Sequence, residues 1–407
     1  MHHLLCRFFL TTLYACRISP LSPPPPFEGR RVSSPRPTAL LPRKTPSFPP
    51  PKQAQRSRLL TANRDKKKFM RDLDEGGCVA TGARWMEAQW DTIADLPLNR
   101  IALLGTHNSG SYACGGRYAG DAPGEIASLP KFVRRGLLPI VRSWAQCQNT
   151  TVLKQLRSGA RMLDLRIHFE KATNAAFACH GLVSAPLSTL LNHVRVFVDN
   201  HPHEVVVLNV HRMHVVSAEG RSLELGSVPE CIAEVMDQIG KAVGSSGRLA
   251  MDLTPQSPLK RFIEENSRIV VINRHAPFEA ADRWYWSHPH VENDWPDSNE
   301  VNRLFTHAAE TVVQRASDKM HIMELVRTPQ GIDFVKFLLY PKRAYFRKPT
   351  DRTAVWLQQH CHLENPIMTD SVNIIFVDML DAHLDSHLLK ALADINKMKL
   401  RLFLQNK

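Results

Sequence analysis

The feature that most restricts the fold of this chain is a series of short, continuous apolar runs, each ending in polar residues. The runs are Arg100–Asn108, Ala160–His168, Glu204–Arg212, Arg268–Arg274, Lys319–Val326 and Asn373–Leu380. Uninterrupted Val, Ile and Leu are typical of strands buried on both faces, and therefore of parallel strands covered by helices. Helix-like stretches, such as Pro186–Asn200 and Val228–Val243, lie between most of the runs. The pattern predicts an α/β fold built on parallel strands.

Two α/β architectures fit this pattern. Six or more strand units within about 290 residues fit a TIM-like (β/α) barrel better than an open sheet. The barrel can be regular, irregular or incomplete. An open doubly wound sheet usually carries a glycine-rich phosphate loop after its first strand. Gly105 and Gly110 stand at that position, but no Lys-Ser/Thr pair follows Gly110. We therefore predict the barrel and keep the doubly wound sheet as the alternative.

The positive charge of the chain is concentrated in its first 69 residues. They carry 14 of the 52 Lys and Arg, 12 of the 28 prolines, and only two acids, Glu28 and Asp65, so the remaining chain has 38 basic and 37 acidic residues. Such a segment cannot bury enough apolar area to offset its ordering entropy. We predict a disordered basic extension over 1–69, a lead-in over 70–94 and a single catalytic barrel over 95–407. The neutral charge balance of the body gives no support for a nucleic-acid partner.

Targeting and compartment are only weakly indicated. The first residues are apolar, with Arg7 and Arg17 and no acid before Glu28, which resembles a targeting sequence; the alternative is an untranslated stretch with Met70 as the start. The eight cysteines form no C-x-x-C pair, which disfavours a zinc site and favours free thiols in a reducing, intracellular compartment. No later segment reaches about 18 consecutive apolar residues, so we expect no transmembrane helix.

Polar residues at the ends of the predicted strands are the candidate functional residues. In a barrel these strand ends meet at one face, where active sites lie. A second histidine, His180, stands in the segment between two of the runs. Two imidazoles can remove and donate protons, and a guanidinium can hold a phosphate in a bidentate fork, which suits phosphodiester cleavage. The strand-end residues are His107, Asn108, Asp164, Arg166, His211, Arg212, Arg274 and Asp378.

Seven stretches of the chain combine the motifs H-N, C-Q-N, L-D-L-R and H-G at defined spacings. They are GTHNSGS, AGDAP, SLPKFV, SWAQCQNTTVLKQLRSGARMLDLRI, CHGLVSAPL, EVVVLNV and NIIFVD. This combination resembles the X domain of phosphatidylinositol-specific phospholipase C, and within that superfamily the glycosylphosphatidylinositol (GPI) phospholipase C of kinetoplastids most of all. The similarity extends over roughly residues 95–385.

The resemblance implies a role for each catalytic candidate. His107 matches the general base that acts on the inositol 2-hydroxyl, and Asp378 matches the carboxylate that orients it. His180 matches the general acid for the diacylglycerol oxygen. Arg166 stands where calcium-free members place an arginine, and an arginine there supplies the positive charge that calcium otherwise provides.

Further positions have less defined expectations. Asp164, two residues from Arg166 on the same strand, is expected to fix that arginine. Asn108 is expected to contact the phosphate or His180. Arg274 is a candidate inositol ligand, and the role of His211 is open. Trp295 either stacks on the inositol ring or is a packed loop aromatic.

The cysteine beside the second histidine also has two readings. Cys179 precedes His180 directly in the sequence. It is either a small buried spacer or a reactive thiol.

The expected reaction follows from these roles. The inositol 2-hydroxyl attacks the phosphate on its own ring, an intramolecular step favoured by proximity, giving diacylglycerol and an inositol 1,2-cyclic phosphate. The resemblance implies no metal or other cofactor and no obligate protein partner. Phosphatidylinositol and its GPI form remain equal candidates as substrate.

Access to a lipid requires a membrane surface. Phe132–Val141 combines apolar bulk with two arginines. The segment fits an interfacial loop or short helix, which would make the protein a peripheral membrane protein. It fits an ordinary amphipathic helix on the barrel equally well.

Two other functions are compatible with the same fold. One is a catalytically silent X-domain module that binds phosphoinositides, although such modules usually lack a histidine or the cation. The other is a metal-dependent glycerophosphodiester phosphodiesterase, which needs carboxylates near the first histidine. Asn-Ser-Gly-Ser follows His107 instead.

Overall fold

The computed structural model describes residues 80–244, 248–275, 284–331, 333, 342–382 and 385–405. The predicted extension over 1–69 and the first ten residues of the predicted lead-in lie outside this range. Within it, no helix is both long enough and apolar enough to cross a lipid bilayer.

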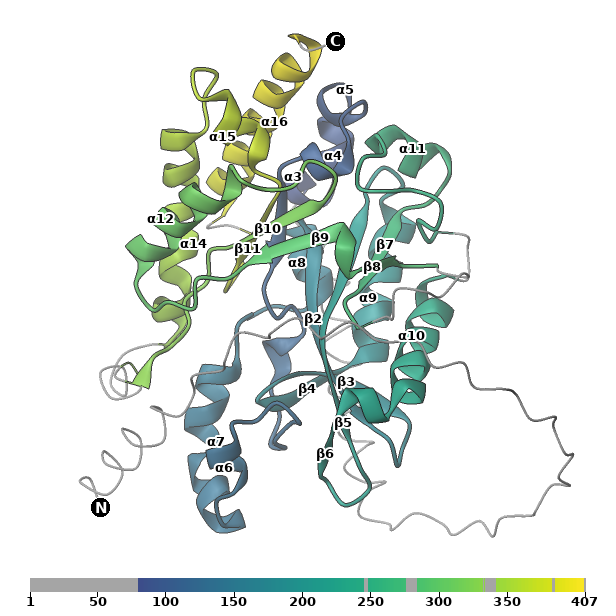
Figure 1. The fold of residues 1–407 in the computed structure, drawn as a ribbon, viewed down its shortest axis with the longest axis vertical. Helices are drawn as coiled ribbons and strands as arrows, with labels where there is room; N and C mark the ends of the chain where they lie inside the picture. Colours follow the sequence, from purple (N-terminus) through teal and green to yellow (C-terminus); the bar gives the residue numbers. More distant parts are fainter. Residues whose placement is uncertain are drawn as a thin grey trace, which may run out of the picture. The chain divides into compact units, whose positions relative to one another are not determined.

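Eight parallel strands form a nearly closed barrel (Figure 1). They are β1 (Leu103–Thr106), β2 (Ala160–Glu170), β5 (Val206–Val216), β7 (Ile269–Asn273), β8 (Trp286–Ser287), β9 (Val291–Asp294), β10 (Met320–Glu324) and β11 (Ile374–Val377). Each strand pairs with the next in this order except β8 with β9, and β11 returns to β1 with Leu103 opposite Ile374. Within the described chain, β8 and β9 do not pair, so the barrel is open between them. The predicted irregular TIM-like barrel is confirmed.

Short strands extend two of the barrel strands beyond the rim. The far half of β2 pairs with antiparallel β3 (Ala175–His180), which pairs in turn with β4 (Leu182–Pro186). The end of β5 pairs with β6 (Ser222–Leu223). Antiparallel β3 ends at His180 and therefore brings this side chain back toward the rim.

Helices surround the strands (Figure 1). On the outside of the barrel they are α8 (Val152–Arg157), α9 (Leu187–Asn200), α10 (Pro229–Val243), α11 (Leu259–Glu264), α12 (Val301–Val312), α14 (Lys342–His360), α15 (Pro366–Ser371) and α16 (Ser386–Gln405). The link from β1 to β2 adds α6 (Gly124–Ala127) and α7 (Lys131–Ala145). Single 3₁₀ turns are η2 (Leu98–Arg100), η3 (Ser111–Ala113), η4 (Leu225–Ser227) and η5 (His288–His290). The helices predicted over 186–200 and 228–243 correspond to α9 and α10.

The strands are buried on both faces because their side chains alternate between two cores. Leu103, Ile374 and Phe376 join the apolar cluster that fills the barrel. Their neighbours Leu104 and Ile375 join a second cluster, together with buried residues of α12, α14, α15 and α16. Side chains of a strand alternate between faces, so a continuous apolar run is what a strand between two cores requires.

The N-terminal end of the barrel is covered by the described part of the lead-in. It forms α3 (Ala80–Ala83), α4 (Trp85–Ala88) and α5 (Trp90–Ile93). Trp85, Met86 and Ile93 belong to the same apolar cluster as the barrel interior. Residues 85–93 are therefore part of the folded body rather than a tether to it.

We expect deletion of residues 1–69 to leave soluble protein with an unchanged thermal unfolding midpoint, because that segment has no predicted core. Deletion of residues 1–90 is expected to abolish soluble expression, because it removes Trp85 and Met86 from the interior. Circular dichroism melts of the two truncated chains test this. Loss of folding in the shorter deletion would show that the basic segment belongs to the fold.

Candidate active site

The turn that follows β1 fixes the first histidine. Asn108 has a φ of 43°, a left-handed conformation that Asn tolerates, and its backbone N–H donates to Asp164 Oδ2 at 3.0 Å. Glycine is needed on both sides because a Cβ at Gly105 would lie 2.5 Å from the Phe376 ring, and one at Gly110 would lie 2.3 Å from Ala178. The two glycines thus allow close packing around the turn that carries His107.

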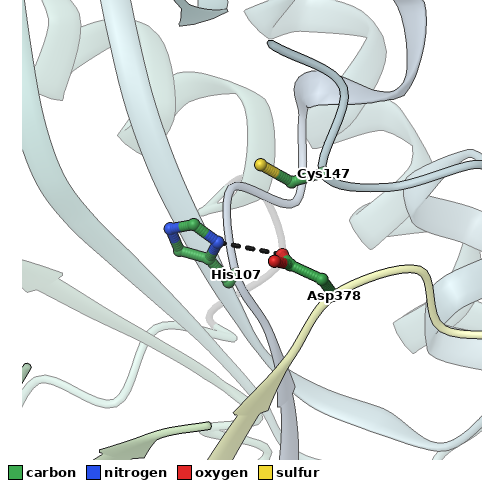
Figure 2. A group of neighbouring side chains, drawn as sticks. All are labelled: His107, Cys147 and Asp378. Carbon is green, nitrogen blue, oxygen red and sulfur yellow. Dashed lines mark hydrogen bonds and ion pairs between the residues drawn. The ribbon is translucent and has the colours of Figure 1, made fainter. Parts of the chain in front are cut away.

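His107 is paired with the carboxylate at the end of β11. Its Nδ1 lies 2.9 Å from Asp378 Oδ1, although 271 residues separate the two in the sequence (Figure 2). Its Nε2 lies 3.0 Å from the Asn108 amide nitrogen, which can only donate. These partners favour the tautomer with the proton on Nδ1 and a lone pair on Nε2. In this form Nε2 can accept a proton.

His180 faces the same space from the end of β3. Its ring centroid is 6.2 Å from that of His107, and the two rings are nearly perpendicular. Its Nδ1 lies 2.9 Å from the carbonyl oxygen of Ala145, which can only accept a hydrogen bond. The proton therefore resides on Nδ1, and Nε2 is the nitrogen that can exchange a proton with a ligand.

A cysteine lies between the two histidines, and sequence reasoning did not single it out. Cys147 Sγ is 3.5 Å from His180 Nδ1, and the Asn108 amide donates to it at 3.6 Å. Cys179, the thiol next to His180 in the sequence, is buried in β3 at 2% exposure. The C-Q-N motif was the available sequence signal for Cys147. Its next residue, Gln148, donates through its side chain to the backbone oxygens of His107 and Val377 at 2.9 and 3.0 Å, and so ties the motif to the site.

The buried charges of this group shift one another. Burial disfavours the Cys147 thiolate, but the charges and hydrogen bonds of His180 and His107 outweigh it and hold the thiol pKa well below its usual value. Burial likewise opposes protonation of both imidazoles, but Cys147 raises the pKa of His180 and Asp378 raises that of His107. Burial, followed by the charge of Cys147, raises the pKa of Asp378 to about 7. Opposite charges in a desolvated site thus favour a thiolate beside protonated imidazole.

Asp164 and Arg166 lie on β2 but are not paired as we expected. Asp164 is fully buried and accepts hydrogen bonds from the backbone of Asn108 and, at 3.4 Å, from the Asn209 amide. Among the described residues, the Arg166 side chain has no hydrogen bond or ion pair, and its buried Nε has no acceptor. The β2–β5 register shifts between Leu165 and Arg166, where β5 has one extra residue, His211. Asp164 thus supports the His107 turn, and the Arg166 guanidinium makes no hydrogen bond or ion pair among the described residues.

His211, another predicted ligand, lies beside Asp164. It stands on β5, and its Nδ1 is 3.3 Å from Asp164 Oδ1, within ion-pair distance but without hydrogen-bond geometry. Burial raises the pKa of Asp164, but the neighbouring imidazole of His211 outweighs it, and the net pKa is well below its usual value. His211 therefore lies beside the carboxylate that supports the His107 turn.

Two further predicted ligands stand at other strand ends of the same rim. Arg274 follows β7, and burial lowers its pKa although the charges of Asp164 and Glu324 oppose that shift. Trp295 follows β9 with 39% exposure, and its indole N–H donates to Thr328 at 3.0 Å. Glu324, which closes β10 and accepts from Asn293 at 2.7 Å, has no sequence motif that marks it as a rim residue.

Known proteins resemble this chain in sequence and in fold. The family model PI-PLC X matches residues 140–283. The resemblance to the PI-PLC X family is confirmed. The segment that matches PI-PLC X contains Cys147, Arg166 and His180 but neither His107 nor Asp378, which only the barrel closure brings beside them.

Relatives of the PI-PLC X type occur in several organisms. The human PI-PLC X domain-containing protein 2 is 24% identical over 252 residues, 61% of this chain and 78% of that protein. The variant-surface-glycoprotein phospholipase C of Trypanosoma cruzi is 30% identical over 146 residues, 32% of this chain and 37% of that protein. Its counterpart in Trypanosoma brucei brucei is 23% identical over 285 residues, 64% of this chain and 73% of that protein.

Solved structures share the barrel. The phosphatidylinositol-specific phospholipase C of Listeria monocytogenes superposes with a TM-score of 0.50 at 15% identity, covering 76% of this chain and 98% of that one. A Staphylococcus aureus phosphatidylinositol-specific phospholipase C gives a TM-score of 0.52 at 14% identity, covering 79% and 98%. At this identity the likeness concerns the fold alone.

Proposed function

We propose that this protein is a phospholipase C-type phosphodiesterase that cleaves phosphatidylinositol or a GPI lipid into diacylglycerol and inositol 1,2-cyclic phosphate without a metal. The observation that carries the proposal is the pairing of His107 with Asp378 at 2.9 Å, opposite His180 with ring centroids 6.2 Å apart. General acid–base cleavage requires one group that accepts a proton and another that donates one, both facing the same substrate. Two histidines on opposite sides of one space can supply these two groups.

The reaction uses each histidine once. His107 Nε2 accepts the proton of the inositol 2-hydroxyl, whose oxygen attacks the phosphorus, while Asp378 steadies the imidazolium that forms. The bond from phosphorus to the diacylglycerol oxygen breaks, and His180 Nε2 donates a proton to that oxygen. The raised pKa of His180 keeps this donor protonated near neutral pH.

The remaining rim residues stabilise and orient the substrate. Arg166, without a partner among the described residues, supplies the positive charge for the phosphate oxygens. Asp164 is a positioning residue that acts through the backbone of Asn108. Arg274, His211 and Trp295 are proposed to contact the inositol.

The proposed substrate lies in a membrane, and α7 is the element that fits a membrane surface. Phe132 is 78% exposed near its start and Arg135 is exposed on the same helix, while Trp144 and Ala145 anchor its end in the protein. An apolar side chain with neighbouring cations is suited to the interface of anionic lipids. We propose peripheral binding of an intracellular membrane through α7, with no obligate protein partner.

Metal independence gives a direct test of this function. In excess EDTA, cleavage of phosphatidylinositol or GPI vesicles is expected to proceed at full rate, with the cyclic phosphate detected by phosphorus NMR. Arg166→Asp is expected to lose about 10²-fold or more in turnover because the phosphate charge is no longer balanced, whereas Arg195→Asp on α9 serves as a control and should be neutral. Loss of wild-type activity in EDTA with recovery by calcium would overturn the metal-free mechanism. Absence of cleavage of either lipid would favour a silent binding module.

The pH dependence of kcat/KM provides a second test. His107 must be neutral and His180 protonated, and the pKa of each is raised. Both limbs of the bell-shaped profile should therefore lie at higher pH than for ordinary imidazoles, with the acidic midpoint above about 6.5. Cys147→Ser removes a negative charge that raises both pKa values, so it should shift both limbs to lower pH. Cys179→Ser is the control, and equal profiles for the two variants would contradict the assignment.

A further inference from the structure

The base, its carboxylate partner and the neighbouring thiol form a compact set of metal ligands. The ligand atoms of His107, Cys147 and Asp378 all lie within 4.8 Å of one another (Figure 2). We propose that these three side chains bind a thiophilic divalent cation, for which Zn²⁺ is the natural fit. We further propose that its binding reversibly blocks the reaction; this second half rests on the proposed function.

The donor set identifies the class of metal. Imidazole nitrogen, thiolate sulfur and carboxylate oxygen are the ligands of zinc in proteins, and three protein ligands leave a fourth position for water. Calcium and magnesium prefer oxygen ligands and do not favour a thiolate. The site is therefore expected to discriminate for zinc and cobalt against calcium and magnesium.

The three ligands come from distant segments that are held rigidly together. The backbone N–H of Met379 donates to the carbonyl of Cys147 at 2.8 Å, and that of His107 donates to Val377 at 3.1 Å. The Gln148 side chain bridges two of these segments through His107 and Val377. A site whose ligand-bearing backbone is already fixed loses little conformational freedom when the ion binds.

Two buried acceptors beside the cluster fit an occupied site. Asp378 Oδ2 and Asn108 Oδ1 have no hydrogen-bond partner among the described residues. The first can take part in coordination. The second can accept a hydrogen bond from His107 Nε2 if the Asn108 amide rotates, since its nitrogen now faces that atom at 3.0 Å.

Binding would remove the catalytic base by a simple proton balance. The metal replaces the proton on His107 Nδ1, and this proton moves to Nε2, whose lone pair is then lost. The thiol, where protonated, releases its proton to solvent. His107 can no longer accept a proton from a substrate hydroxyl, so the site is inactive until the metal leaves.

Cobalt binding tests the site independently of any activity. The full-length protein, stripped with EDTA and exchanged into metal-free buffer, is titrated with Co²⁺. We expect a thiolate-to-cobalt charge-transfer band that Zn²⁺ displaces and that excess Ca²⁺ and Mg²⁺ leave unchanged. Cys147→Ser should lose the band and bind zinc at least about tenfold more weakly. Cys179→Ser, which alters the thiol adjacent to His180 in sequence, should retain both, and Cys361→Ser replaces it as the control if that variant does not fold.

The binding result decides the first half of the proposal. An absent band, or equal zinc affinity in wild type and folded Cys147→Ser, would overturn the site. A band that only Cys179→Ser abolishes would also overturn it, since the ligand would then be the wrong cysteine.

Lipid cleavage decides the second half. Zinc should inhibit the wild type by at least tenfold, EDTA should restore the rate, and Cys147→Ser should keep a larger fraction of its own zinc-free rate. Equal fractional inhibition of wild type and Cys147→Ser would overturn the block. A cobalt band in a protein that cleaves neither lipid would uphold the metal site and refute the proposed function instead.

Discussion

Replacing either His107 or His180 with alanine is expected to lower turnover by about 10²-fold or more, because each supplies one proton transfer of the proposed reaction. The double variant should have a turnover only slightly below that of the less active single variant, since general acid and general base act as a unit. Turnover on phosphatidylinositol vesicles under saturating conditions measures both effects. The expected losses concern kcat, because neither histidine is assigned to bind the lipid in its ground state.

The control for this experiment is His387→Ala, which removes an exposed histidine at the start of α16. It should retain wild-type turnover. Turnover within tenfold of wild type for His107→Ala or His180→Ala would refute the assignment of that residue. Asp378→Asn should reduce turnover as well, because the amide can hold the His107 ring but cannot balance the imidazolium charge.

The buried ion pair between Arg161 and Glu204 is expected to govern stability. Both side chains are fully buried, and Arg161 Nε donates to Glu204 Oε2 at 2.7 Å. The guanidinium also donates to the carbonyls of Gly82 and Ala83, and the carboxylate accepts from the backbone of Met86. Arg161→Met should lower the free energy of unfolding by about 3–5 kcal/mol, because it leaves a buried carboxylate without its cation.

Denaturant unfolding of the full-length chain measures this loss. The matched control is Lys241→Met, which breaks the exposed pair with Asp237 on α10 and should change the free energy of unfolding by less than about 1 kcal/mol. A similar small change for both variants would mean that the pair does not hold the lead-in to the barrel. Because the pair lies at the N-terminal end of the strands, remote from His107, folded Arg161→Met protein should keep its turnover.

Much of the barrel was predictable because its strands are coded locally. The six apolar runs correspond to β1, β2, β5, β7, β10 and β11, each of which is mostly apolar and buried. The two barrel strands that were missed, β8 and β9, have two and four residues. In Trp286–Ser287 and Val291–Asp294 no periodic pattern can develop, so their place beside the barrel opening followed only from pairing with β7 and β10.

The candidate site was predictable to the extent that its residues stand at strand ends. The sequence by itself determined that His107, Arg274 and Asp378 directly follow apolar strands, and the C-terminal ends of parallel strands meet at one rim. Tertiary structure decided which of them meet. The register of β11 against β1 brings Asp378 beside His107, and the fold of the turn after β1 places the backbone N–H of Asn108 on Asp164 Oδ2.

The position of Cys147 shows most clearly that neighbours in the sequence need not be in contact in the fold. Cys179 is the sequence neighbour of His180, yet Cys147, 33 residues away, is the cysteine in contact with its ring. Alternation along β3 turns adjacent side chains to opposite faces, while the loop before α8 returns across the rim. Adjacency in sequence was therefore a poor guide to contact, and only the closed barrel fixed which thiol lies between the two histidines.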